Sequence, residues 1–222
     1  MSWFKSIMYD WDGYNWLISQ KMHLFLQNKF AISALYFFSQ SLGKVYLFPL
    51  HVLLLSFIIA WVIRKNNSNR TATTMLYMKH FFLLLVNMSI GLAIALGIKY
   101  SLQYPRPFCK ALYNLNEHMM YFLKHKQETD CVKLGDSFPS GHVAYLLLFV
   151  TSFWSVMSAG IKKLSAAAVI AMMISRVALG YHFFADTIYA CLLVLCVYPL
   201  SKLILNHYFP KYEPTIRQFL KL

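Results

Sequence analysis

Three short polar clusters carry the residues of this sequence that could do chemistry. The first places two cations seven positions apart, Lys99 and Arg106, with a proline next. The second spans residues 137–142 and reads Ser-Phe-Pro-Ser-Gly-His. The third spans residues 175–186 and ends at an aspartate. Cations, histidines and a carboxylate are the groups that hold and transfer a phosphoryl group, whose transition state spreads negative charge over its oxygens.

The third cluster pairs a histidine with a carboxylate. His182 and Asp186 are four positions apart, which predicts that they lie on one helical face within reach of each other. An aspartate bonded to one ring nitrogen fixes the tautomer and leaves the other nitrogen free to attack. Arg176, upstream in the same cluster, adds a positive charge suited to an anion.

The second cluster leads into an apolar run and predicts a helix start. Such a start offers unpaired backbone N–H groups and the positive end of the helix dipole. Gly141 lets a ligand approach the backbone closely, and Pro139 suits the first turn. We therefore expect an anion site at Ser140 and Gly141. His142 and His182 together fit a two-step displacement, in which one attacks and the other protonates the leaving oxygen.

Long apolar runs must position these clusters. Five runs approach the roughly 20 residues that a membrane-spanning helix needs, at residues 45–63, 81–98, 143–161, 164–179 and 187–205. Residues 22–42 predict a sixth span, weakened by internal polar residues, and residues 1–21 are rich in tryptophan and tyrosine, as interfacial helices are. The predicted fold is all-α: a polytopic membrane helical bundle with about six transmembrane helices plus an N-terminal interfacial helix, in which residues 1–222 form a single integral-membrane domain.

The composition supports the same class. Hydrophobic residues make up 59% of the chain and charged residues 13%, whereas soluble domains average about 45–50% and about 25%. This balance argues against a soluble enzyme, a disordered chain or a collagen. The net charge of +13 does not indicate nucleic acid, because the basic residues lie between apolar runs and not on one face of a soluble fold.

The order of the spans brings the clusters together. Lys99 ends one span, residues 139–142 begin the next, and two further crossings return the chain to the same face at residues 175–186. The loops on the opposite face carry more lysine and arginine, which marks the cytoplasmic side. We therefore expect a multi-pass protein of the cytoplasmic (inner) membrane whose clusters face the periplasm or exterior.

Neither a metal nor another cofactor is expected, because the clusters offer too few of the ligands that metal sites need. Two cysteines, Cys109 and Cys131, lie in the polar loop between the first two clusters. A disulfide between them would suit an oxidising compartment, and two free thiols are equally consistent with the sequence.

The three clusters together resemble the signature of the type 2 phosphatidic acid phosphatase family. Lysine and arginine are seven apart with a proline following, Pro-Ser-Gly-His is intact, and Ser-Arg is followed by His182 and Asp186 at the family's spacing. The resemblance covers residues 99–186. It implies a metal-independent lipid phosphatase in which His182 is the nucleophile, Asp186 orients it and His142 is the general acid. The phosphate would be held by the remaining motif residues, Lys99, Arg106, Ser140, Gly141 and Arg176.

The substrate is less constrained than the chemistry. The short length, the aromatic N-terminal helix and the basic loop between the first two clusters are similar to the lipid A 4'-phosphatase branch of the family. Undecaprenyl diphosphate, phosphatidylglycerol phosphate and phosphatidic acid are alternatives. The same residues could serve a lipid phosphotransferase, and a non-catalytic anion-binding bundle is a third reading. The expected partners are a phosphorylated membrane lipid and the bilayer; the sequence leaves the oligomeric state open.

Overall fold

The computed structural model describes residues 11–25, 28–43, 70–102, 104, 106–107 and 137–219. Across these ranges the regular secondary structure is helical, which confirms the predicted all-α class for this part of the chain. In chain order the elements are η2 (Trp11–Gly13), α2 (Tyr14–Phe25), α3 (Lys29–Gly43), α5 (Arg70–Leu102), α8 (Gly141–Phe153), η6 (Trp154–Val156), α9 (Ala159–Ala178) and α10 (Phe184–Phe219).

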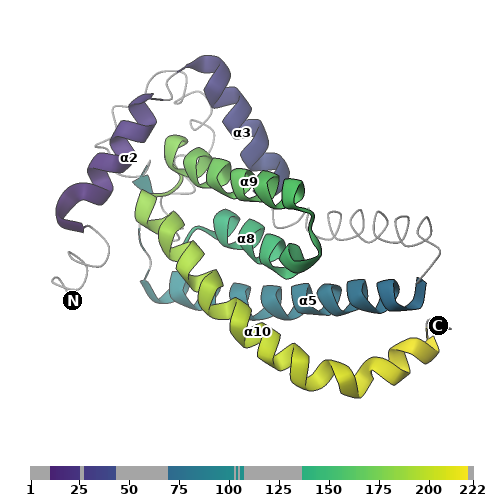
Figure 1. Cartoon of the computed structure of the whole chain (residues 1–222). Coiled ribbons are helices and arrows are strands. Elements are labelled where there is room, and N and C mark those ends of the chain that lie inside the picture. The colour runs from purple at the N-terminus through teal and green to yellow at the C-terminus, as the bar shows by residue number, and fades with distance from the viewer. Residues whose placement is uncertain are drawn as a thin grey trace.

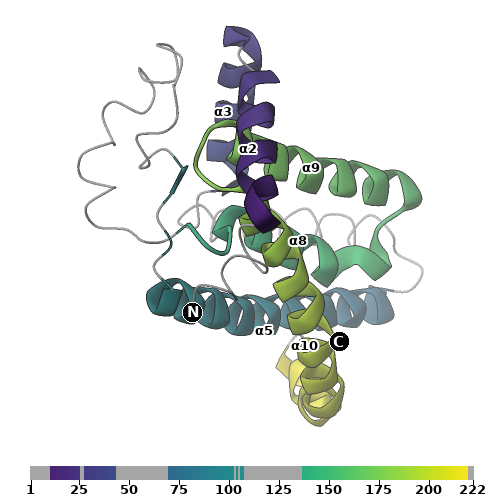
Figure 2. The same cartoon turned by 90° about the vertical axis from the view of Figure 1, so that its left-hand side faces the viewer.

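Helix α8 lies at the centre of the bundle. It packs against α3, α5, α9 and α10, and Figures 1 and 2 both show it enclosed between α9 and α5. Its apolar residues face neighbours on every side, so they contribute much of the main core. The fully buried members of that core come from four helices: Leu84, Val143, Leu148, Met172, Ala190 and Val194.

Helices α5 and α8 approach each other closely at Gly91. A Cβ atom at this position would lie 2.6 Å from a methyl group of Leu148, a separation that real Cβ atoms do not show. Small residues allow this kind of close helix contact in membrane bundles. The absence of a side chain at Gly91 therefore sets the distance between the two helices.

Polar side chains fix the same pair of helices further along. Asn87 donates from its side-chain nitrogen to the Ser152 hydroxyl at 2.8 Å, and His80 contacts the Ser152 carbonyl oxygen at 2.7 Å. Asn87 and Ser152 are fully buried. Interhelical hydrogen bonds of this kind contribute about 0.6 kcal/mol each in membrane proteins, and they hold the register of the two helices.

Two helices of the described residues are long and apolar enough to cross a bilayer. They are Thr71–Leu102 and Phe184–Phe219, with mean hydropathies of 2.4 and 2.1, and Gly141–Val156 is a shorter apolar helix. These helices suggest a membrane protein. The predicted run at residues 45–63 lies outside the described residues, and the predicted count of about six spans stays a prediction.

Helix boundaries differ from the predicted spans in two places. The predicted span at residues 22–42 is divided, because α2 continues to Phe25 and α3 begins at Lys29. The Asn28 side chain caps α3 by accepting from the Phe30 amide at 2.9 Å. This cap marks the start of a separate helix at Lys29. The predicted span at residues 143–161 is also too long: α8 ends at Phe153, and Ser158 caps α9.

Helix α10 extends well beyond the apolar run that predicted it. Three prolines lie inside it, Pro199, Pro210 and Pro214, and Figure 1 shows the helix curving through its second half. A proline removes one backbone hydrogen bond and crowds the preceding turn, so bending is its expected effect. Because these prolines lie far along the helix, the first turn of α10 keeps regular geometry.

Candidate active site

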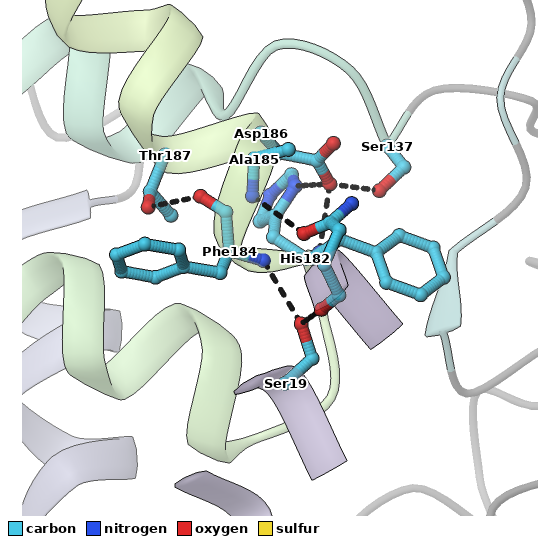
Figure 3. A network of polar contacts seen from close by, with 9 residues as sticks. Ser19, Ser137, His182, Phe184, Ala185, Asp186 and Thr187 are labelled. Atoms are coloured by element: carbon cyan, nitrogen blue, oxygen red, sulfur yellow. Dashed lines mark hydrogen bonds and ion pairs between the residues drawn. The ribbon is translucent and has the colours of Figure 1, made fainter. Parts of the chain in front are cut away.

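Three hydrogen bonds of the site converge on one oxygen of Asp186. Its Oδ2 atom accepts from the Ser137 hydroxyl, from the Phe183 amide at 2.9 Å and from Nδ1 of His182 at 3.3 Å. Figure 3 shows Ser137 and His182 converging on this carboxylate from opposite sides. Asp186 is fully buried and His182 is only 1% exposed. Three donors on one buried oxygen leave the carboxylate, and therefore the histidine, little freedom to rotate.

The histidine and the aspartate do not share a helical face, contrary to the prediction from their spacing. Helix α10 begins at Phe184, so Asp186 lies in its first turn while His182 lies before the helix. Helix α9 ends at Ala178, and Gly180 turns the chain with a φ of 70°, a conformation that favours glycine. The carboxylate reaches back over the start of its own helix to meet the histidine.

The carboxylate determines the tautomer of His182. An ionised carboxylate can only accept hydrogen bonds, so Nδ1 of the neutral imidazole carries the proton. The lone pair then resides on Nε2, the nitrogen that faces away from Asp186. His182 is thus oriented as a nucleophile, with a fixed donor on one side and a basic nitrogen on the other.

Positive charge surrounds this histidine. Burial, followed by the charges of Arg176, Arg106, Lys99 and His142, holds the pKa of His182 well below its usual value. Each of those four groups belongs to one of the three sequence clusters, and each is close enough to act on the same ring. The three clusters therefore come together around His182, and the membrane face on which they lie stays a prediction.

Backbone hydrogen bonds tie the clusters to one another. The Ser137 amide donates to the carbonyl oxygen of Tyr104 at 2.9 Å, and the Ser140 amide donates to the carbonyl oxygen of Asp186 at 3.0 Å. The first bond joins the segment that carries Arg106 to the second cluster. The second bond joins the start of α8 to the start of α10.

The start of α8 is arranged differently from the prediction in one respect. Pro139 lies before the helix and not in its first turn, because α8 begins at Gly141 with Ser140 as its cap position. The Ser140 side chain makes no cap hydrogen bond, and its buried Oγ has no partner among the described residues. Apart from its neighbours in the chain and in α8 itself, no atom of the described residues lies within 4 Å of where a Cβ of Gly141 would be. Space and a hydroxyl group are therefore available beside the positive end of α8.

Arg176 is buried near the end of α9. Its exposed fraction is 2%, and Nη1 donates to the hydroxyl of Ser39, on α3, at 2.8 Å. The guanidinium also lies over the ring of Tyr181, 4.2 Å from the ring centroid. A planar cation held on two sides keeps a fixed orientation, which suits recognition of phosphate oxygens.

Sequence reasoning missed several residues that hold the site. Asn15 and Ser19, on α2, accept backbone N–H groups of Ala185 and Phe184 at 2.8 and 3.0 Å. Ser39 holds Arg176. Ser137 lay inside the second cluster but received no role. The first three lie more than 130 positions from their partners, so no local spacing pattern could indicate them.

The possible disulfide and the expected absence of a metal both stay predictions. Cys109 and Cys131 lie outside the described residues, so their pairing stays open. In the ranges that the structure describes, no three His, Cys, Asp or Glu side chains gather as a metal site would require.

The lowered pKa of His182 predicts a pH dependence. To act as the predicted nucleophile, His182 must be unprotonated, and a pKa below the usual 6.5 keeps it so as the pH falls from neutral to 6.5. The acidic limb of kcat/KM, which reports the free enzyme, should therefore have its midpoint below pH 6.5. The check is a pH profile of phosphate release beside an NMR titration of the His182 ring. A common midpoint at or above 6.5 would contradict the charge environment described above.

Comparison with known proteins agrees with this arrangement. A sequence profile of the PAP2 superfamily matches residues 76–207, which is more than half of the chain and includes all three clusters. No curated protein and no solved structure matches. Members of this superfamily are generally phosphatases that act on phosphoric monoesters. The match and the length of the two apolar helices together suggest a membrane phosphatase. The chain belongs to the PAP2 superfamily.

Proposed function

We propose that this protein is a metal-independent lipid phosphate phosphatase that works through a phosphohistidine intermediate. The observation that carries the proposal is the buried His182–Asp186 pair, 3.3 Å between Nδ1 and Oδ2, under the charges of four surrounding cationic or titratable groups. A buried neutral histidine with a fixed tautomer is a nucleophile. The cations around it would attract and hold an anionic electrophile such as a phosphate group.

In the first step Nε2 of His182 attacks phosphorus and the bond from phosphorus to the lipid oxygen breaks. His142 gives its proton to the leaving alkoxide, so that the lipid departs as an alcohol. The new N–P bond holds the phosphoryl group on the imidazole. Asp186 stabilises the positive charge that develops on the ring, since its Oδ2 already contacts Nδ1.

In the second step a water molecule replaces the departed lipid. His142, now neutral, takes a proton from that water as the oxygen attacks phosphorus. The N–P bond breaks, its electron pair returns to Nε2, and inorganic phosphate leaves. The same histidine is thus acid and then base, as the reversal of the first step requires.

The phosphoryl oxygens are held by groups from all three clusters. Arg176 is buried beside the histidine and is already oriented by Ser39. Ser140 offers a buried hydroxyl, and Gly141 leaves the N-terminus of α8 open to a close approach. The positive charges of Lys99 and Arg106 also act on His182. Donors that are fixed before the reaction stabilise developing charge without reorganising.

We propose a bisphosphorylated lipid A as the substrate, hydrolysed at its 4'-phosphate on the outer face of the cytoplasmic membrane. The substrate is supported by the aromatic N-terminal segment and the basic loop between the first two clusters, which are similar to the lipid A 4'-phosphatase branch. The outer face is supported by the excess of basic residues in the loops of the opposite face. The other lipids named above would use the same chemistry and differ only in the headgroup.

The test is phosphate release by purified protein in detergent from four lipids: bisphosphorylated lipid A, undecaprenyl diphosphate, phosphatidylglycerol phosphate and phosphatidic acid. Release from lipid A alone, with loss of the 4'-phosphate by mass spectrometry, is the expected result. Release from a different lipid would replace the substrate while keeping the mechanism. An acceptor-dependent product without free phosphate would identify a phosphotransferase instead, and no turnover of any lipid by folded protein would overturn the proposal.

Chelation provides a separate prediction. Because every proposed step uses protein side chains, EDTA should leave the rate of phosphate release within about twofold of the untreated rate. The measurement is a titration of EDTA against the rate on the preferred lipid, with an EDTA–magnesium mixture as the control for ionic effects. Strong inhibition that a divalent cation reverses would require a metal-dependent mechanism.

A further inference from the structure

The first turn of α10 has an unusual set of caps. A helix leaves its first backbone N–H groups without partners inside the helix, and a serine or asparagine at the cap position normally accepts one of them. The cap position here is Phe183, whose side chain has no acceptor. The Phe183 amide donates instead to Asp186 Oδ2, and the Asp186 amide donates to the Phe183 carbonyl oxygen. The amides of Phe184 and Ala185, which lie between these two residues, need acceptors from another part of the chain.

Helix α2 supplies both acceptors. The Phe184 amide donates to the Ser19 hydroxyl at 3.0 Å, as Figure 3 shows, and the Ala185 amide donates to Asn15 Oδ1 at 2.8 Å. Ser19 in turn donates to the Asn15 carbonyl oxygen at 2.7 Å, which orients its hydroxyl. Asn15 is 2% exposed and Ser19 is fully buried. The two side chains therefore cap a helix other than their own.

Aromatic contacts reinforce this junction. Trp16 packs on Phe183 and Trp11 packs on Phe184, with ring centroids 6.2 Å apart in each case. The two phenylalanines lie between His182 and Asp186 in the sequence. Tryptophans that predicted an interfacial helix thus also contact the side chains of the segment that joins the two catalytic candidates.

Helix α3 makes the corresponding contact with the arginine. Ser39 is fully buried and accepts from Nη1 of Arg176 at 2.8 Å. Both α3 and α2 pack against α9, the helix that carries Arg176. The family match begins at residue 76, so both helices lie outside it.

We propose that α2 and α3 are working parts of the active site: Asn15 and Ser19 position the nucleophile, and Ser39 positions the phosphate-binding arginine. The inference rests on the proposed function, in which His182 attacks and Arg176 holds the phosphate. All three are positioning residues, because they act through the α10 backbone or through Arg176 and not on the substrate.

The two helices should have different kinetic signatures. Loss of the Asn15 acceptor leaves a buried N–H unpaired and lets the first turn of α10 shift, which misplaces His182 but leaves the anion-binding groups intact. A nucleophile misplaced by about 1 Å costs about 100-fold in rate. Asn15→Leu should therefore lower kcat about 10- to 100-fold with KM nearly unchanged. Asn15→Asp, which keeps the acceptor, should restore kcat to within about threefold.

Ser39→Ala should act on anion affinity. A hydrogen bond to a charged group is worth about 1.5–3 kcal/mol, so a loosened Arg176 should raise the Ki of inorganic phosphate, a competitive product inhibitor, about tenfold or more. Ser39→Thr keeps the hydroxyl and should keep the wild-type Ki. Ser41→Ala is the matched control on the same helix, because the Ser41 hydroxyl donates only to its own helix at Phe37. Gln20→Leu, a second amide-to-leucine change on α2, is the control for Asn15→Leu.

Hydrogen exchange tests the geometry without requiring activity. In Asn15→Leu the Ala185 amide loses its acceptor, so a peptide covering residues 184–185 should exchange at least about tenfold faster, while a peptide from the middle of α8 should not change. If Asn15→Leu does not fold, Ser19→Ala replaces it with Ser19→Thr as its rescue, and the same readouts apply.

The outcomes separate the two proposals. Faster exchange at 184–185, the kcat loss and its rescue by Asn15→Asp, with the Ki effect confined to Ser39→Ala, would establish the inference. An active wild type with Asn15→Leu unchanged in kcat and exchange would overturn it while the phosphatase function stood. A folded wild type that turns over no lipid would overturn the function. If the Asn15→Leu variant of that inactive protein also showed unchanged exchange at residues 184–185, the inference would be overturned as well.

Discussion

The His182→Ala variant is expected to release phosphate at least about 10⁴-fold more slowly than the wild type. The alanine removes the proposed nucleophile, and the surrounding cations cannot form a bond to phosphorus. Rapid-quench experiments with a ³²P-labelled lipid should trap an acid-labile phosphoprotein in the wild type and none in the variant. His182 is buried, so the melting temperature in detergent must be measured beside the rate.

A matched histidine is available as a control. His207 lies on the exposed part of α10, where it contacts Lys211 at 3.1 Å, well outside the site. His207→Ala should keep the wild-type rate and the phosphoprotein. If folded His182→Ala retained more than about 1% of the wild-type rate, His182 would not be the nucleophile, and a labelled phosphoprotein in that variant would direct attention to His142.

The second large effect concerns the carboxylate. Asp186→Asn should lower kcat about 10³-fold while KM changes little. The amide has the shape of the carboxylate and can still accept from Ser137 and the Phe183 amide through its oxygen. In that orientation its oxygen cannot stabilise an imidazolium as an anion does. In the flipped orientation its NH₂ group takes the place of Oδ2, donates to Nδ1 and so reverses the tautomer that makes Nε2 basic. The expected signature is slow formation of the phosphoprotein in a quench experiment, without loss of substrate binding.

Glu213→Gln is the matched carboxylate-to-amide change on the same helix. Glu213 pairs with Arg217 at 2.8 Å near the end of α10, so the variant should lose at most a partly exposed ion pair and keep full activity. A folded Asp186→Asn protein with at least a third of the wild-type kcat would show that the buried His182–Asp186 pair is structural.

The two helix starts that meet at the site have opposite arrangements. The first turn of α10 is closed by protein groups, namely Asp186 itself and the side chains of Asn15 and Ser19. The start of α8 lacks a side-chain cap from Ser140 and has open space beside Gly141. A closed start holds a catalytic pair still, and an open start leaves its positive end for an anion. These opposite arrangements support the proposal that α10 holds the catalytic pair and that the start of α8 binds the phosphate.

The sequence by itself determined the class of fold and the clusters that form the site. Apolar runs predicted helices because a helix must bury or embed an apolar surface. Helices α5 and α10 contain two of the predicted runs, and α9 contains all but the last residue of a third. Polar groups at the ends of those runs had to meet once the order of crossings was fixed. That is why Lys99, Arg106, His142, Arg176 and His182 could be grouped from their positions alone.

Only the tertiary structure decided how the groups are held. The spacing of His182 and Asp186 predicted proximity but placed both on a helix, whereas a turn at Gly180 delays the start of α10 until Phe184. Likewise Pro139 lies before α8 and not within it. Helix ends depend on competing caps within one or two residues, and apolar periodicity is too coarse to resolve that competition.

The contacts of Asn15, Ser19 and Ser39 are beyond any reading of local pattern. Each side chain bonds a residue 137 to 170 positions away, and in the sequence each looks like an ordinary polar residue on a helix. Their partners exist only after α2 and α3 have packed on α9 and α10. A backbone amide that lacks a local cap takes whichever acceptor the packed neighbour presents, and that choice is made by the three-dimensional arrangement and not by spacing along the chain.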